Sequence, residues 1–247
     1  MRLSFSCCSS NKSQSLCTRQ HLKQRPKMAH LSDARIALLA TSSLVFVCGI
    51  IAFITPNWLA SDRRLYGAEF VKLGLWETCF RSIRAPDDLE FRKHWVGCRW
   101  LWREEYQELR GYLLPSFFVA TQVLYTIGFL LSLVSSIGLL ALQICFITDR
   151  EVFALKIHGF IMFVSALLCT IAVVTFGIRG DDRDWMPDPE HNFLSWSFGL
   201  AVVGSLFAWI ASLLFWIESR ILHNREEKRE QQDYNMEQVH NIKSSAI

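Results

Sequence analysis

The sequence has no charged residue in four long stretches, although 20% of all its residues are charged. These stretches are residues 36–55, 112–147, 157–178 and 193–217. A helix on the surface of a soluble fold would show a polar face at every turn, whereas ~20 consecutive apolar residues cross a bilayer as one helix. We therefore predict an all-α membrane protein whose four transmembrane helices span residues 36–56, 112–147, 157–178 and 193–217.

The chain also lacks the residue sets on which most active sites depend. The spans contain no paired acids, no His/Cys set at metal-ligand spacing and no phosphate-binding glycine loop; His158 is more typical of helix packing. Enzymes need a polar constellation in a pocket, and transporters are expected to bury charges. We therefore expect no enzyme activity, no catalytic residue, no metal and no cofactor. The net charge of +3 combines loops on two sides of a bilayer, so it does not indicate nucleic acid.

The second stretch is longer than one crossing requires. Its thirty-six uncharged residues would extend roughly 54 Å as a helix, against a hydrocarbon core of ~30 Å. Two spans joined by a hairpin would also explain the length, but no turn cluster marks the middle. We expect one span near 121–145, with an extension outside the membrane where Pro115 would cause the least disruption.

The distribution of basic residues predicts the orientation. Residues 1–35, expected to be a disordered cytoplasmic segment, carry seven Lys or Arg and one acid, whereas 179–192 carries two Arg and five acids. Both termini are therefore predicted in the cytoplasm. The segments 57–111 and 179–192 would be outer loops, and 148–156 and 218–247 would be a cytoplasmic loop and tail. Cys7, Cys8 and Cys17 would then be either palmitoylated or reduced thiols.

Two of the eight cysteines, Cys79 and Cys98, fall in the first outer loop. The turn signal Ala85-Pro86-Asp87-Asp88 separates two segments rich in apolar and aromatic residues, 65–83 and 91–102. Folding the chain at that turn places the two cysteines opposite each other, and thiols outside the cell oxidise rather than bind metal. We predict a disulfide that stabilises this small sheet by ~3 kcal/mol.

These features together resemble the claudin and peripheral-myelin-protein superfamily. The residues that carry the resemblance are Trp58, Gly74-Leu75-Trp76, Cys79, Cys98 and the basic Arg110 before the second span. The cysteines are further apart than in vertebrate claudins, so the chain looks most like divergent invertebrate claudin-like proteins of septate junctions. Trp58 or Trp76 could instead be an interfacial anchor, since Trp collects at membrane surfaces.

The resemblance implies a left-handed four-helix bundle carrying an extracellular antiparallel β-sheet built mainly from the first outer loop. It also implies a plasma-membrane protein of lateral cell–cell junctions, septate or tight in type, which binds claudin-like proteins in cis and in trans and forms or organises a paracellular barrier. An auxiliary subunit of an ion channel or receptor, or an adhesion role, would use the same architecture. The first outer loop has ten basic and nine acidic residues, and we predict no ion selectivity from it.

Two further patterns concern contacts at the helices and the tail. Small residues recur at helical spacing in the second and fourth spans, and such stripes allow close helix packing, within the bundle or between copies: Gly128, Ser132 and Ser136, then Ser197, Ala201, Ser205 and Gly204, Ala208, Ser212. The ending Lys243-Ser244-Ser245-Ala246-Ile247 fits a PDZ scaffold, in which Ser245 and Ile247 would be read from an added strand.

Overall fold

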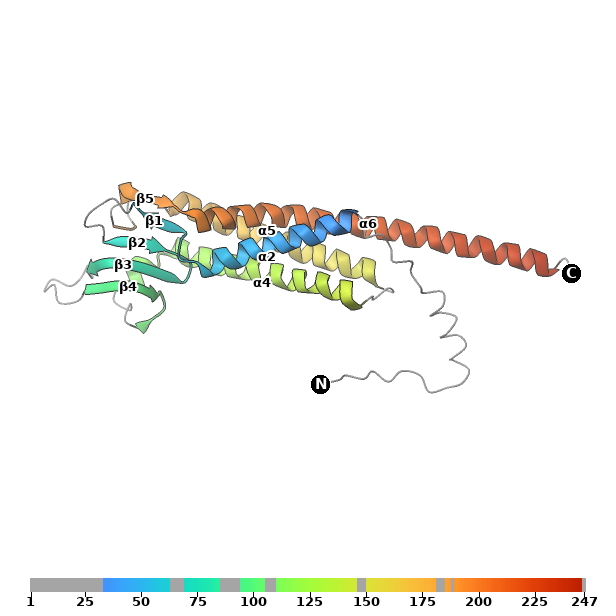
Figure 1. The fold of residues 1–247 in the computed structure, drawn as a ribbon, viewed down its shortest axis with the longest axis horizontal. Helices are drawn as coiled ribbons and strands as arrows, with labels where there is room; N and C mark the ends of the chain where they lie inside the picture. The colour runs from blue at the N-terminus through green and yellow to red at the C-terminus, as the bar shows by residue number, and fades with distance from the viewer. Residues whose placement is uncertain are drawn as a thin grey trace, which may run out of the picture. The chain divides into compact units, whose positions relative to one another are not determined.

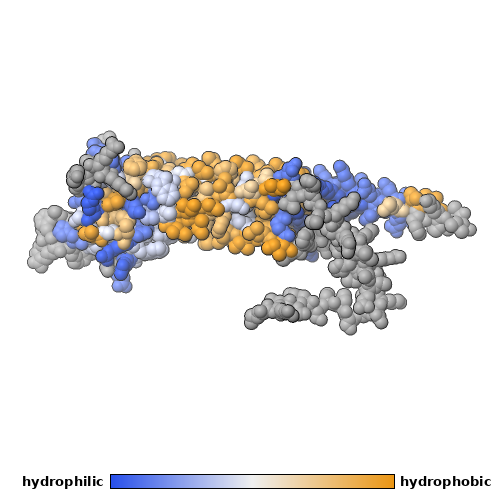
Figure 2. Space-filling model, viewed as in Figure 1, coloured by the Kyte–Doolittle hydropathy of each residue, from blue (hydrophilic) through white to orange (hydrophobic). Residues whose placement is uncertain are grey.

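A computed structural model of the protein describes residues 33–62, 69–84, 94–104, 110–145, 150–180, 185–187 and 189–245. Four helices in it are long and apolar enough to cross a membrane: α2 (Asp33–Ile54), α4 (Ser116–Cys145), α5 (Glu151–Arg179) and α6 (Trp196–Ser245). They run alongside one another in a bundle (Figure 1), and a belt of apolar residues crosses the face of the bundle drawn in Figure 2. The predicted four-helix membrane architecture is confirmed.

A five-stranded antiparallel sheet lies at one end of this bundle (Figure 1). The strands are β1 (Leu59–Ser61), β2 (Phe70–Leu73), β3 (Glu77–Arg84), β4 (His94–Trp100) and β5 (Asn192–Leu194), in the order β4-β3-β2-β1-β5. Four strands come from the segment predicted as the first outer loop. The fifth, β5, immediately precedes α6 and pairs with β1, so the sheet closes over the end of the bundle.

Prolines set two of the helix boundaries near the sheet. Helix α2 ends at Ile54, two residues before Pro56 and two residues earlier than expected. The expected helix over 112–147 is divided into a short α3 (Arg110–Leu113) and α4. Pro115 lies between them, and its carbonyl accepts hydrogen bonds from the backbone N–H groups of Phe118 and Val119 (3.0 and 3.1 Å). Proline thus starts a helix here and does not kink one.

The other two helices also differ from the expected spans. Helix α5 begins at Glu151, six residues before the uncharged stretch. Residues 193 and 194, expected in the fourth span, belong to β5, and α6 begins at Trp196. Helix α6 continues past the expected span end at residue 217 to Ser245, beyond the ends of the other helices (Figure 1). The extension is rich in Glu, Lys, Arg and Gln, which favour helix without apolar packing.

The interior is filled by two clusters of buried residues. One joins the sheet to the adjacent ends of the helices and is rich in aromatic residues; the other lies towards the opposite end and includes Leu38, Leu155 and Phe215. The predicted small-residue stripe of α6 is buried within the bundle. In α4, a Cβ on Gly128 would lie 2.6 Å from Cys169 Sγ. These stripes therefore let the helices of one chain pack closely.

An ionic cluster joins three helices at the end of the bundle away from the sheet. The Arg35 guanidinium of α2 contacts the Glu151 carboxylate of α5, and its Nε lies 3.7 Å from Glu218 Oε1 of α6. The Glu218 side chain is only 1% exposed. These residues flank the uncharged stretches, so the sequence located the charges without showing that they meet.

Arg35 is the cation in both of these ion pairs. Replacing it with Met should lower the free energy of unfolding by about 2 kcal/mol or more, because the buried Glu218 carboxylate loses a cation. Thermal unfolding of the detergent-solubilised protein measures this as a lower Tm. Arg220→Met is the matched control, since Arg220 is an exposed arginine on α6, the helix that carries Glu218. An equal, small change in both variants would contradict the assigned role.

Candidate functional site

The side chain of Trp58 connects the sheet to the bundle. It is fully buried, and its indole Nε1 donates a 2.7 Å hydrogen bond to the carbonyl of Ala52 in the last turn of α2. The indole also packs edge-on against one aromatic ring from each of the other three long helices, with centroids 5.1–5.8 Å apart: Tyr125, Phe176 and Phe198. The interpretation of Trp58 as an interfacial anchor is therefore wrong, since no part of its side chain is exposed.

The backbone N–H and carbonyl groups of Trp58 are both hydrogen-bonded to neighbouring chain segments. Its N–H donates to the carbonyl of Leu73 (2.8 Å), and its carbonyl accepts from the N–H of Ser195 (2.9 Å). These bonds continue the β1–β2 and β1–β5 pairings up to the bundle. One residue therefore belongs to the sheet through its backbone and to the helices through its side chain.

The residues Gly74, Leu75 and Trp76 form the connection between β2 and β3, which we call the Gly-Leu-Trp turn. A Cβ on Gly74 would lie 2.5 Å from Pro56 Cα and 2.7 Å from the Thr55 carbonyl oxygen. Both are backbone atoms and cannot move aside. The position requires glycine because two chain segments touch there. Trp76, expected within a strand, lies in this turn.

Gln122 holds the turn from the bundle side. Its side-chain amide Nε2, on α4, donates a 2.5 Å hydrogen bond to the carbonyl of Leu75, and both residues are buried. Gln122 is not among the site residues predicted from the sequence. The available signal was an amide inside an uncharged span, because a polar group in an apolar environment needs a hydrogen-bond partner. The sequence could not show which carbonyl it meets.

The predicted disulfide between Cys79 and Cys98 is present. The two residues are paired across β3 and β4, with Cys79 buried and Cys98 exposed. The Glu77 carboxylate lies within 4.8 Å of both sulfur atoms. Since both sulfurs are in the disulfide, they are not thiolate ligands for a metal.

The connection before β5 adds an unexpected part of the core. Trp185 and Met186 are buried, and the Trp185 ring lies 4.9 Å from Phe117 and 5.3 Å from Phe118, both near the start of α4. Sequence analysis treated 179–192 as an acidic loop. The signal that could have found the contact was this pair of large apolar residues within an acidic segment.

Some predicted residues are placed only in part. Arg110 is the first residue of α3 and Ser245 the last residue of α6, and only their backbones are described. Ile247, the turn 85–88 and the three cysteines before residue 33 lie outside the described residues. The helical state of Ser245 bears on scaffold binding, because PDZ domains bind an extended strand.

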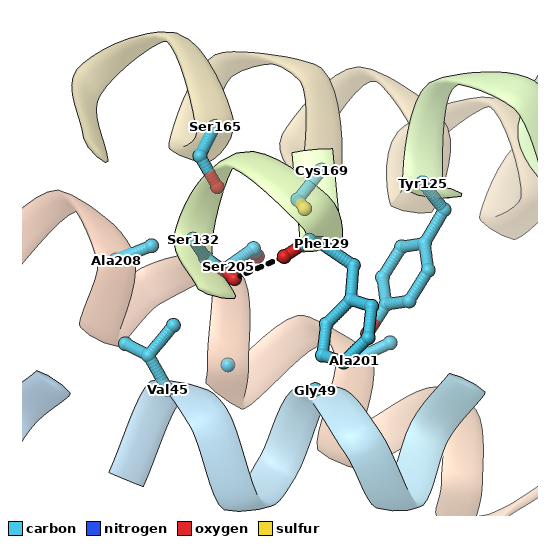
Figure 3. Close-up of a pocket in the computed structure, with 11 residues that line it drawn as sticks. Val45, Gly49, Tyr125, Phe129, Ser132, Ser165, Cys169, Ala201, Ser205 and Ala208 are labelled. Carbon is cyan, nitrogen blue, oxygen red and sulfur yellow. Dashed lines mark hydrogen bonds between the residues drawn. The ribbon is translucent and has the colours of Figure 1, made fainter. Parts of the chain in front are cut away.

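A small cavity lies inside the bundle between α2, α4, α5 and α6 (Figure 3). Its volume is about 10 Å³, near the lower limit for one water molecule. Ser132 and Ser165 line the cavity. The Ser132 hydroxyl donates to the carbonyl of Phe129 (2.7 Å), and the Ser165 hydroxyl donates to the carbonyl of Gly128 (2.6 Å). It is a packing defect rather than a substrate site, and the sheet with its attachment is the better functional candidate.

Comparison with known proteins agrees with this choice. A family model described as PMP-22/EMP/MP20/Claudin tight junction matches residues 43–217. The matched range includes Trp58, the Gly-Leu-Trp turn, the disulfide and the parts of all four long helices that pack around them. No individual curated protein matches the chain significantly.

Gly74→Ala tests the close contact beneath the turn. The added Cβ would overlap the backbone at Thr55 and Pro56, so we expect a loss of about 1–3 kcal/mol in the free energy of unfolding and a lower Tm in detergent. Gly111→Ala is the control, because a Cβ there meets nothing within 4 Å. Equal Tm values for the two variants would show that the turn moves away from Pro56 at little cost.

Cys79→Ser tests the disulfide. Its loss removes ~3 kcal/mol of loop constraint and leaves Cys98 as an exposed thiol, so we expect the variant to be retained in the secretory pathway. Surface biotinylation measures this. The control is Cys79→Ser/Cys98→Ser, which lacks the disulfide without the free thiol; if it reaches the surface better than the single variant, the thiol contributes to retention. Normal surface delivery of both would show that the sheet folds without the disulfide.

Proposed function

The chain belongs to the PMP-22/EMP/MP20/claudin family, and from this membership we propose that it acts at cell–cell junctions of septate or tight type, where it forms or organises the paracellular barrier. The supporting observation is the disulfide-linked sheet fixed to the end of the membrane bundle through Trp58 and the Gly-Leu-Trp turn. A barrier requires a surface outside the membrane that keeps its orientation relative to the bilayer.

The attachment gives the sheet that fixed orientation. Trp58 contacts aromatic rings of α4, α5 and α6 and the end of α2, while Gln122 binds the turn. A preorganised surface loses less entropy when it binds a partner. Such a sheet can associate repeatedly in one geometry, as side-by-side and cell-to-cell assembly requires.

The edges of the sheet are the proposed contacts for claudin-like partners in cis and in trans. Among the described strands, β4 and β5 each pair with one neighbour, β3 and β1 respectively. An edge strand presents backbone donors and acceptors that another chain can use. The partner surfaces would therefore include β5 and the part of β4 that lies away from the bundle, and Trp58 would act only by supporting them.

We propose that the sheet lies outside the cell and that both termini are cytoplasmic. The excess of basic residues before α2 supports this orientation. The disulfide supports it independently, because disulfides persist in oxidising compartments. If Ile247 carries the terminal carboxylate, we also propose that the cytoplasmic tail binds a PDZ scaffold. Binding would require Ser245 to leave α6 and adopt an extended backbone.

Tracer exclusion across an epithelium depleted of the protein tests the proposal. We expect an uncharged dye too large for ion channels to leak between cells whose polarity is normal, and re-expression of the wild-type chain to restore the seal. An intact seal after depletion would contradict a barrier role and favour an auxiliary subunit of a channel or receptor. Whole-cell currents would then be measured in the same cells.

A further inference from the structure

Two tryptophans, one at the end of β4 and one two residues after it, are exposed although they are large and apolar. The side chain of Trp100 is 55% exposed, and that of Trp102 is 44% exposed. Strand β4 is an edge of the sheet and runs towards the helices (Figure 1), so these residues lie at its membrane-proximal end. We call Trp100 and Trp102 the tryptophan edge.

A chain of aromatic contacts connects this edge to the rim of the bundle. The Trp100 ring stacks on Trp76 with centroids 5.9 Å apart, and Trp76 meets Phe53 edge-on at 5.4 Å. Phe53 is the penultimate residue of α2. Trp100 is therefore connected to the end of a membrane-spanning helix through the rings of Trp76 and Phe53.

The position of Arg35 and the length of α2 indicate where the bilayer boundaries lie. Arg35 and Ile54 are separated by roughly 28 Å along the helix axis, close to the ~30 Å thickness of a hydrocarbon core. With Arg35 at one boundary, the last turn of α2 lies at the other. Ile54, 65% exposed on that turn, would face lipid. Phe53 and its contact Trp76 are then at the level where acyl chains meet headgroups.

We propose that the tryptophan edge inserts into the headgroup region of the bilayer and makes the membrane-proximal end of one sheet edge a lipid-binding surface. Tryptophan favours this layer because its ring is apolar and its N–H can donate to polar headgroups. Arg99 and Arg103 flank the two residues in sequence.

The backbone holds the edge in this position. Leu101, between the two tryptophans, is buried in the core, and its N–H donates to the carbonyl of Trp76 (2.8 Å). The N–H of Arg103 donates to the carbonyl of Trp100 (3.2 Å), closing a turn. The buried Leu101 therefore fixes the chain while Trp100 and Trp102 remain outside it. Because this argument uses only the membrane position, it holds whether the protein seals a junction or serves a channel.

Photocrosslinking in lipid bilayers tests the proposal. The photoreactive amino acid p-benzoylphenylalanine would be placed at position 100, 102 or 96 of the full chain, reconstituted in phosphatidylcholine vesicles carrying a radiolabelled lipid. Val96 is the matched control, because it is 58% exposed on the same strand but lies roughly 13 Å further from the bundle. The intact disulfide, read from migration without reductant, confirms that each variant is folded.

We expect the lipid label at positions 100 and 102 to exceed that at position 96 by about tenfold. Equal labelling at all three positions would overturn the proposal, because the edge would then have no preferred depth. Crosslinks from positions 100 and 102 to a second copy of the chain, without lipid, would also overturn it and would assign the edge to a protein contact.

Discussion

The hydrogen bond from the Trp58 indole to the Ala52 carbonyl is the contact on which the rest of the structure depends. Helix α2 ends at Ile54, so its last carbonyls have no partner within the helix. Thr55 satisfies the carbonyl of Ile51 and Trp58 that of Ala52. The ring that donates this bond also fills the space between three other helices. The same side chain therefore caps the end of α2 and attaches the sheet to the bundle. A smaller side chain would leave both an unpaired carbonyl and a void.

The family motif separates into two physical parts. Trp58, Gly74 and Leu75 attach the sheet: the first fills the bundle end, the second permits contact with Pro56, and the third offers its carbonyl to Gln122. Cys79 and Cys98 instead join β3 to the edge strand β4. Attachment fixes where the sheet lies, whereas the disulfide fixes its outermost strand, so the two parts can change independently.

Features set by the length of a segment or the position of a turn could be predicted from the sequence, whereas contacts set by the rotation of a helix could not. The transmembrane helices could be predicted because the thickness of a bilayer sets the length of the uncharged stretch that crosses it. The disulfide could be predicted because the position of a hairpin turn determines which residues of the two strands face each other. Contacts that depend on helix rotation could not be predicted. The pairing of Gln122 with Leu75 and the meeting of Arg35 with Glu218 both depend on which face of a helix turns inward. Likewise, Trp58 read alone fits a membrane surface as well as a core.

Contacts at both ends of the bundle fix the orientation of the sheet relative to the helices. The Arg35 cluster ties α2, α5 and α6 at one boundary of the apolar belt, and Trp58 ties α2, α4, α5 and α6 at the other. With both boundaries fixed, the sheet cannot tilt without breaking buried contacts. Exposed positions of the edge strands, such as Val96 of β4, lie outside those contacts and can vary in sequence at little cost to the attachment. Under the proposed function, partner choice would be determined at such positions, while the membrane anchorage stays the same.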